Sequence, residues 1–197
     1  MQHTMEHLSC FVGGMLVLGS EGEHSARYMK LAVGLAETCV QMYSRQPTGI
    51  APDSVSFGGG LDFAVADGKN ILRPETVETL FYLYRKTGEQ KYRDQGWTIF
   101  QAFEKHCKAK GGYSGLLDVR GLPARQDGKQ QSFFLAETLK YLYLLFEDSS
   151  ALDLDEWVFN TEAHIFKIRP RETSLLFQQE GSRRPPGQQI PRSMMRT

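Results

Sequence analysis

Residues 72–88 read LRPETVETLFYLYRKTG, and this stretch has the start, the apolar face and the end of a helix. Pro74 suits the first helical position, because proline lacks an N–H that would be left without a partner there. The apolar side chains recur at helical spacing on one face, namely Val77, Leu80, Phe81 and Tyr84. Gly88 is expected to end the helix. The stretch therefore predicts an amphipathic helix packed within a helical protein.

Further helical periodicity lies on both sides of this stretch. It predicts helices from about 25 to 43, from about 91 to 106 with a stop at Gly111-Gly112, and from about 132 to 147. An apolar segment from Leu8 to Leu18 also predicts a short helix that lies in the core. Its two glycines, Gly13 and Gly14, suit close packing in the core.

A β-hairpin is expected within the segment 46–72, where apolar residues alternate on either side of Gly58-Gly59-Gly60. The fold class is therefore mainly α, an array of paired helices with a small β-hairpin excursion. Helical periodicity alone leaves a toroid, a solenoid and a bundle open. After Ile168 the composition changes to Arg, Pro, Gln and Ser, so residues 169–197 are expected to form a disordered tail after one folded domain, 1–168.

Charge and motifs exclude several classes of partner. Lys plus Arg and Asp plus Glu both number 23, so no net charge attracts nucleic acid. The sequence has no phosphate-binding loop, dinucleotide fingerprint or Gly-x-Ser-x-Gly elbow, so nucleotide chemistry and serine hydrolysis gain no support. It also has no apolar run of about 18 residues and no signal peptide, so no membrane segment is expected.

The three cysteines, Cys10, Cys39 and Cys107, are too few and too scattered for a disulfide scaffold. Their spacing alone favours buried free thiols. A second short pattern, His3-Thr4-Met5-Glu6-His7, matches the His-x-x-Glu-His motif of zinc peptidases, in which two histidines on one helical turn bind zinc. It lies at the chain start, where helices fray, and nothing downstream marks a third ligand, so surface positions for His3 and Glu6 are the favoured alternative.

Three glutamates, Glu75, Glu137 and Glu162, each lie beside a predicted helix start or turn. Capping of the helix dipole, typically about 0.3–1 kcal/mol, is one explanation. Their neighbours are a cation, an aromatic pair and a hydroxyl group, which together suit a sugar site: Arg73, Phe133, Phe134 and Thr161. Glycosidases need paired carboxyl groups, and Ca²⁺ takes oxygen ligands of the kinds present here.

Four motifs occur in order: HLSCF at 7–11, LRPET at 72–76, QSFFLAETLKY at 131–141 and FNTEAH at 159–164. Together they resemble class I α-1,2-mannosidases, glycoside hydrolase family 47. A further match, GGYSG at 111–115, is most similar to the Golgi branch. The resemblance covers about Met5 to Ile168. It implies a calcium-dependent, inverting hydrolase of terminal α-1,2-linked mannose on high-mannose N-glycans.

The same resemblance implies that residues 1–168 are the C-terminal half of a barrel, or toroid, of paired helices. The family's general acid and any membrane anchor would then precede Met1. Because an inverting glycosidase needs an acid as well as a base, this chain alone is expected to be inactive. The alternatives are a non-catalytic calcium- and mannose-binding module and, more remotely, the zinc peptidase.

Residue roles follow from the resemblance position by position. Glu75 resembles the general base, Arg73 the residue that grips the neighbouring sugar, and His7 a polar residue lining the site. Phe133 resembles the aromatic floor under the mannose ring. Asp53 stands where the family usually has a glutamate, so one methylene group is missing from a substrate-site carboxylate.

For calcium, Thr161 resembles the direct protein ligand, through its carbonyl and hydroxyl oxygens, and Glu137 and Glu162 resemble the carboxylates that hold calcium's waters. The family also places a disulfide at the positions of Cys10 and Cys39, which replaces the free-thiol interpretation for that pair. Such a bridge implies an oxidising compartment, the lumen of the Golgi or endoplasmic reticulum.

Overall fold

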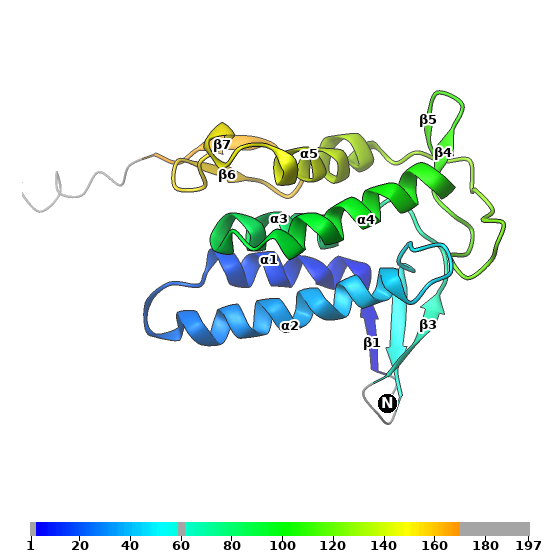
Figure 1. Ribbon diagram of the computed structural model, residues 1–197, viewed down its shortest axis with the longest axis horizontal. Helices are drawn as coiled ribbons and strands as arrows, with labels where there is room; N and C mark the ends of the chain where they lie inside the picture. Colours follow the sequence, from blue (N-terminus) through cyan, green and yellow to red (C-terminus); the bar gives the residue numbers. More distant parts are fainter. Residues whose placement is uncertain (1–2, 59–61, 170–197) are drawn as a thin grey trace, which may run out of the picture.

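The structure is a computed structural model that describes residues 3–58 and 62–169. Within these residues the chain is mainly helical, as predicted, and five α-helices run side by side (Figure 1). They are α1 (Phe11–Leu18), α2 (Ser25–Ser44), α3 (Glu75–Thr87), α4 (Gln90–His106) and α5 (Lys140–Phe146). Helix α3 lies at the centre and contacts the other four. The helix pairs form an open stack rather than a closed ring over the described ranges.

Short antiparallel sheets lie at the ends of this stack. The predicted hairpin is confirmed as β2 (Ser54–Phe57) and β3 (Phe63–Asp67), although residues 59–61 of its glycine turn lie outside the described residues. Strand β1 (His3–Glu6) adds to β2, which the alternation pattern did not predict. Two further small hairpins were also not predicted: β4 (Lys108–Ala109) with β5 (Gly112–Tyr113), and β6 (Trp157–Phe159) with β7 (Ile165–Lys167).

Helix α4 ends at His106, as predicted, and Gly111-Gly112 lies within the β4–β5 hairpin that follows rather than at the end of the helix. One helix prediction needs correction. The helix predicted from 132 to 147 is divided into a π-helix, η3 (Phe134–Leu139), followed directly by α5. A π-helix holds one residue more per turn than an α-helix and is frequent at functional sites.

Helix α3 is buried on all sides rather than on the single predicted face, since every residue from Glu75 to Leu83 is buried. Pro74 is the N-cap residue rather than the first helical residue, so the helix starts one position later than predicted, at Glu75. Gly88 ends it in the left-handed conformation with φ 70°, and the N–H of Gly88 donates to Tyr84 O at 2.8 Å. The helix therefore carries two carboxylates, Glu75 and Glu78, into the core.

The end of α3 gives a stability prediction with its own control. Gly88→Ala is expected to destabilise the protein by about 1 kcal/mol, because a Cβ is disfavoured at positive φ. Gly34→Ala, at an exposed position inside α2 with open space around the added Cβ, is expected to stabilise by about 0.5–1 kcal/mol. Urea unfolding of both variants checks this, and equal signs for the two changes would contradict it.

The predicted close packing at Gly13 and Gly14 is confirmed. A Cβ at Gly13 would lie 2.6 Å from Thr79 Cγ2, and one at Gly14 would lie 2.8 Å from Tyr82 Cδ2. The prediction that the whole segment lies in the core is wrong. The segment begins as a 3₁₀ helix, η1 (His7–Cys10), and α2 and α3 cover only one side of it. The apolar side chains on its other side are therefore exposed, namely Leu8, Phe11, Val12, Met15 and Leu18.

Cys10 and Cys39 form a disulfide, with a sulfur–sulfur distance of 2.11 Å, and Cys107 is a buried free thiol. The bond joins η1 to α2. The bridge implied by the family resemblance is therefore confirmed, and the free-thiol interpretation from spacing is wrong for this pair. Spacing could not predict the bond, because the two cysteines are 29 residues apart in sequence and meet only through the packing of η1 against α2.

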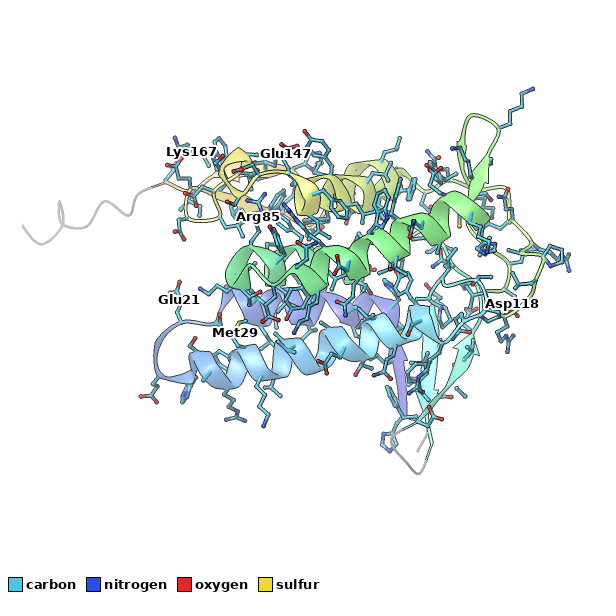
Figure 2. The ribbon with its side chains drawn as sticks, viewed as in Figure 1. Glu21, Met29, Arg85, Asp118, Glu147 and Lys167 are labelled. Atoms are coloured by element: carbon cyan, nitrogen blue, oxygen red, sulfur yellow. A yellow bond between two sulfur atoms is a disulfide. The ribbon has the colours of Figure 1, made fainter. Side chains whose placement is uncertain are left out.

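The β6–β7 hairpin is fastened to the helices by a cluster of four aromatic rings. Phe81 and Tyr82 of α3, Tyr141 of α5 and Phe159 of β6 lie with ring centroids between 5.1 and 6.5 Å apart. Figure 2 shows Arg85 extending from α3 toward this end of the molecule, where its guanidinium donates to the Leu144 carbonyl. The turn between β6 and β7 is thereby held against α3 and α5.

Two remaining predictions concern the ends of the chain. The zinc-peptidase interpretation is wrong in its geometry, since His3 and Glu6 lie in β1 and His7 begins η1, so no single helical turn carries them. The predicted disordered tail is 169–197, and all of it except Arg169 lies outside the described residues. None of the helices in the described part is both long and apolar enough to cross a membrane.

Candidate active site

A sharp turn places the start of α3 inside the protein. Leu72, directly before Arg73, has φ 67°, which is uncommon for a residue with a side chain. Two buried side chains hold this conformation: Leu72 N donates to Asn70 Oδ1 at 2.9 Å, and Thr138 Oγ1 donates to Leu72 O at 2.7 Å. The turn therefore aims the first turn of α3, with Glu75, toward η3.

Glu75 is a buried carboxylate held by charged and polar neighbours. Its Oε2 lies 2.8 Å from His7 Nδ1, and its Oε1 lies 3.6 Å from Arg73 Nη1. Burial would raise the pKa of Glu75, but the hydrogen bond and charge of His7, a backbone N–H and Arg73 together hold that pKa below its ordinary value. Glu75 is therefore ionised at neutral pH, as a general base must be.

Asp53 and Arg73 form a partly buried ion pair beside Glu75. Arg73 Nε donates to Asp53 Oδ1 at 2.7 Å, and both side chains retain some exposure, 25% and 18%. The shorter carboxylate at 53 thus reaches the arginine directly. The pair orients the guanidinium toward Glu75, which leaves part of Arg73 available to a ligand.

Glu78 is a site residue that the sequence did not reveal. It lies one turn after Glu75 on α3, is 8% exposed, and accepts a hydrogen bond from the Tyr141 hydroxyl at 2.7 Å. Burial, with the charges of Glu137 and Glu75, raises the pKa of Glu78 to about 7. The three-residue spacing from Glu75 was the available signal, because residues three apart share a helix face.

Glu137 is the third carboxylate of this cluster and lies on the π-helix η3. Burial, the charge of Glu75 and the charge of Glu162 raise the pKa of Glu137 to about 7, while Lys140 lowers it. Like charges act strongly only at short range, so α3, η3 and the β6–β7 turn bring their carboxylates together. A cluster of this kind concentrates negative charge that a cation would neutralise.

The turn that carries Thr161 and Glu162 has a fixed backbone. Asn160 Oδ1 accepts the N–H groups of Glu162 and His164, at 3.0 and 2.9 Å. Ala163 is buried with φ 55°, and its carbonyl accepts Lys140 Nζ at 2.7 Å. Thr161 and Glu162 are themselves exposed, so their oxygen atoms remain free for a ligand.

The structure thus brings most of the predicted site residues together. His7, Arg73, Asp53 and Glu75 are linked by hydrogen bonds or ion pairs. Glu137 interacts by charge with both Glu75 and Glu162, and Thr161 is adjacent to Glu162. Phe133 directly precedes η3 and is half-buried. Of the aromatic pair, Phe134 packs in the core against Phe103 and Tyr113. The individual roles of these residues stay predictions.

The donor set suits calcium better than a transition metal. Over residues 3–58 and 62–169, no group of three or more His, Cys, Asp or Glu side chains is arranged to hold a metal directly. The β6–β7 turn instead offers the carbonyl and hydroxyl oxygens of the exposed Thr161, which is adjacent in sequence to Glu162. Ca²⁺ accepts such neutral oxygens and waters as ligands, so the residues present fit it.

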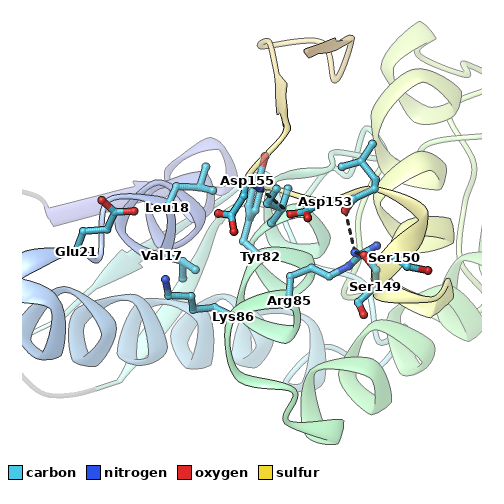
Figure 3. Close-up of a pocket in the computed structure, with 12 residues that line it drawn as sticks. Val17, Leu18, Glu21, Tyr82, Arg85, Lys86, Ser149, Ser150, Asp153 and Asp155 are labelled. Carbon is cyan, nitrogen blue, oxygen red and sulfur yellow. Dashed lines mark hydrogen bonds between the residues drawn. The ribbon is translucent and has the colours of Figure 1, made fainter. Parts of the chain in front are cut away.

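A separate groove lies at the opposite end of α3. It encloses about 500 Å³ and is lined by α1, α3 and the segment from Ser149 to Asp155 (Figure 3). Arg85 crosses it and donates to the carbonyls of Ser149 and Leu152. Arg85 follows Glu75 by ten residues, roughly 15 Å along the helix axis. The groove is therefore distinct from the carboxylate cluster.

Comparisons with known proteins agree with this geometry. The family model described as glycosyl hydrolase family 47 matches residues 1–168. Mannosyl-oligosaccharide 1,2-alpha-mannosidase MNS1 of Arabidopsis thaliana is 53% identical over 170 residues, which cover 85% of this chain and 30% of that protein. The human mannosyl-oligosaccharide 1,2-alpha-mannosidase IC is 44% identical over 180 residues, covering 88% and 29%.

Among solved structures, the alpha-1,2-mannosidase from Trichoderma reesei superposes with a TM-score of 0.79 at 33% identity. The match covers 85% of this chain and 39% of that one. The chain therefore spans about 30% of the length of the two curated relatives above.

Proposed function

Because this chain belongs to glycosyl hydrolase family 47, we propose that it supplies part of the active site of an enzyme that removes terminal α-1,2-linked mannose from high-mannose N-glycans. The observation that carries this proposal is Glu75, a buried and ionised carboxylate fixed by His7 and Arg73. The relatives named above are mannosyl-oligosaccharide 1,2-alpha-mannosidases.

In this proposal Glu75 is the general base of an inverting reaction, and Arg73 binds the neighbouring sugar through the part of its guanidinium that Asp53 leaves free. An inverting glycosidase also needs a general acid. The chain spans about 30% of the curated relatives' length, and we place that acid in the part of the family domain that these residues do not include. High-mannose glycan, as the substrate, is part of the same proposal.

Calcium would be held by the carbonyl and hydroxyl of Thr161, with Glu137 and Glu162 binding its waters. When bound, the cation would supply positive charge that orients the sugar hydroxyls and neutralises the carboxylate cluster. The raised pKa of Glu137 supports this, because charge repulsion from Glu75 and Glu162 is one of its causes. We also propose that the protein works in the secretory-pathway lumen, since its disulfide suits an oxidising compartment.

Thr161→Ala is expected to weaken calcium binding at least about tenfold, because it removes a ligand oxygen and keeps the backbone carbonyl. Calorimetric titration of the full 197-residue chain checks this. Thr98→Ala, which removes an exposed hydroxyl on α4, is the matched control and should bind calcium like the parent chain. Absence of calcium binding by the parent chain, or equal affinities for parent and Thr161→Ala, would contradict the calcium site.

An α-1,2-linked mannobiose assay on the same samples tests the remaining part. Calcium binding without hydrolysis is expected, because the general acid is placed elsewhere. Release of mannose by this chain alone would show that the acid lies within these 197 residues and would overturn its placement.

A further inference from the structure

Two turns beside the carboxylate cluster contain a residue in the left-handed conformation, and both turns are held from the same short segment. Leu72, with φ 67°, and Ala163, with φ 55°, are the two non-glycine residues of the described chain at positive φ. The Leu72 carbonyl accepts from Thr138 Oγ1 at 2.7 Å, and the Ala163 carbonyl accepts from Lys140 Nζ at 2.7 Å. Thr138 lies in η3, and Lys140 begins α5 directly after it. The segment that carries Glu137 therefore holds both turns.

The β6–β7 turn depends on contacts from outside the hairpin. A side chain at positive φ crowds its own backbone, so this conformation persists only where the surroundings favour it. Inside the hairpin, Asn160 Oδ1 accepts the two N–H groups described above, and Ala163 N donates to Asn160 O at 3.0 Å. Among the hydrogen bonds of the described residues, the one from Lys140 alone reaches residues 160–164 from another element. Lys140 is therefore the polar anchor of this turn.

The direction of the Lys140 hydrogen bond is fixed by the chemistry of its two partners. An amino group carries N–H donors and a carbonyl oxygen carries none, so Lys140 is the donor. The 2.7 Å separation is that of a charge-assisted hydrogen bond, and the Lys140 side chain is half-buried. Figure 1 shows both strands of the hairpin beside α5, which Lys140 begins. The bond thus ties the turn to the element that follows Glu137 by three residues.

We propose that Lys140 is a positioning residue for the calcium site, because its hydrogen bond to the Ala163 carbonyl fixes the turn that carries Thr161 and Glu162 relative to Glu137 before any cation binds. This inference rests on the proposed calcium site. Lys140 supplies no ligand oxygen and acts through the backbone of the turn. Its role is therefore to keep the oxygens of the turn in place while the site is empty.

Positioning and charge predict opposite effects when the amino group of Lys140 is removed. The charge of Lys140 acts on Glu137, so it lies close to the carboxylate cluster, where it would repel a second cation. If Lys140 acted by charge alone, removing it would strengthen calcium binding. If it positions the turn, removing it weakens calcium binding, because the turn must then be ordered when the cation binds. The sign of the change therefore distinguishes the two roles.

Nitrogen-15 relaxation of the backbone, with a calcium chelator present, tests the positioning without calcium or substrate. In Lys140→Met, which keeps an unbranched side chain and removes the donor, the order parameters of the Glu162 and Ala163 N–H groups are expected to fall from about 0.85 toward about 0.6. Those of the buried helix α3 should stay at the parent values, since they do not depend on this bond. Lys30→Met, at an exposed position on α2, removes the same charge and should match the parent throughout.

Calorimetric titration of the same variants gives the second readout. Lys140→Met is expected to bind calcium about tenfold more weakly than the parent, and Lys140→Arg, which keeps a charged donor, should lie closer to the parent. Equal or tighter calcium binding by Lys140→Met would overturn the proposal, as would unchanged order parameters in its turn. A parent chain that binds no calcium would contradict the proposed calcium site instead, and the order parameters of the calcium-free chains would still decide whether Lys140 holds the turn.

Discussion

Replacing both Cys10 and Cys39 by alanine is expected to lower the free energy of unfolding by roughly 3–4 kcal/mol. The bond closes a loop with a sequence separation of 29 residues, and a cross-link of that length removes much conformational freedom from the unfolded chain. Its loss should also loosen η1, which carries His7 beside Glu75. Urea unfolding of the parent and the double variant measures the effect.

Reductant provides the control for this prediction. A reducing agent should destabilise the parent by a similar amount and leave the Cys10→Ala/Cys39→Ala variant unchanged, because the third cysteine, Cys107, is already a free thiol. A parent protein whose midpoint is the same with and without reductant would show that the bond contributes nothing to stability.

Glu78→Gln is expected to remove a strong pH dependence of stability. The folded protein holds the pKa of Glu78 at about 7, against an ordinary value of 4.5, so between these values the folded state binds more protons than the unfolded state. This contribution to stability is present below pH 4.5 and is lost as the pH rises through 7. A shift of this size corresponds to roughly 3 kcal/mol, and Glu78 is too buried for solvent to screen much of it.

The measurement is urea unfolding at pH 5 and pH 8 in buffer with a calcium chelator. The parent should lose stability between these values, and Glu78→Gln should lose much less, with a remainder from Glu137. Glu37→Gln, at an exposed position on α2, is the matched control and should retain the parent's slope. An undiminished slope in Glu78→Gln would show that its carboxyl group is not the source.

The sequence predicted those elements whose signals are local. The helices α2, α3 and α4 and the β2–β3 hairpin follow from the periodicity of their apolar residues, and in α3 a proline and a glycine also mark the two ends. Strand β1 was missed because its partner β2 lies about 50 residues later, and the pairing rather than the composition defines it. The strands β6 and β7 have three residues each, too few for a pattern to emerge.

The site was predicted from family motifs and not from spacing. Glu75 and His7 are 68 residues apart, so their 2.8 Å contact depends on the packing of η1 against α3. Glu78 was missed because a glutamate on a surface helix has the same local sequence signal as one in a core. Only the burial of α3 on all sides converts it into part of the carboxylate cluster.

The π-helix η3 has a consequence for how this chain tolerates changes of length. One residue advances an α-helix by about 100°, so the extra residue in η3 sets the angular relation between Glu137 and α5. Deleting a single exposed residue there, such as Leu135, would leave the composition nearly unchanged and turn Glu137 away from Glu75. Changes of length are therefore more tolerable at the exposed residues 120–123 than in these six residues, whose number sets the direction in which the Glu137 carboxylate points.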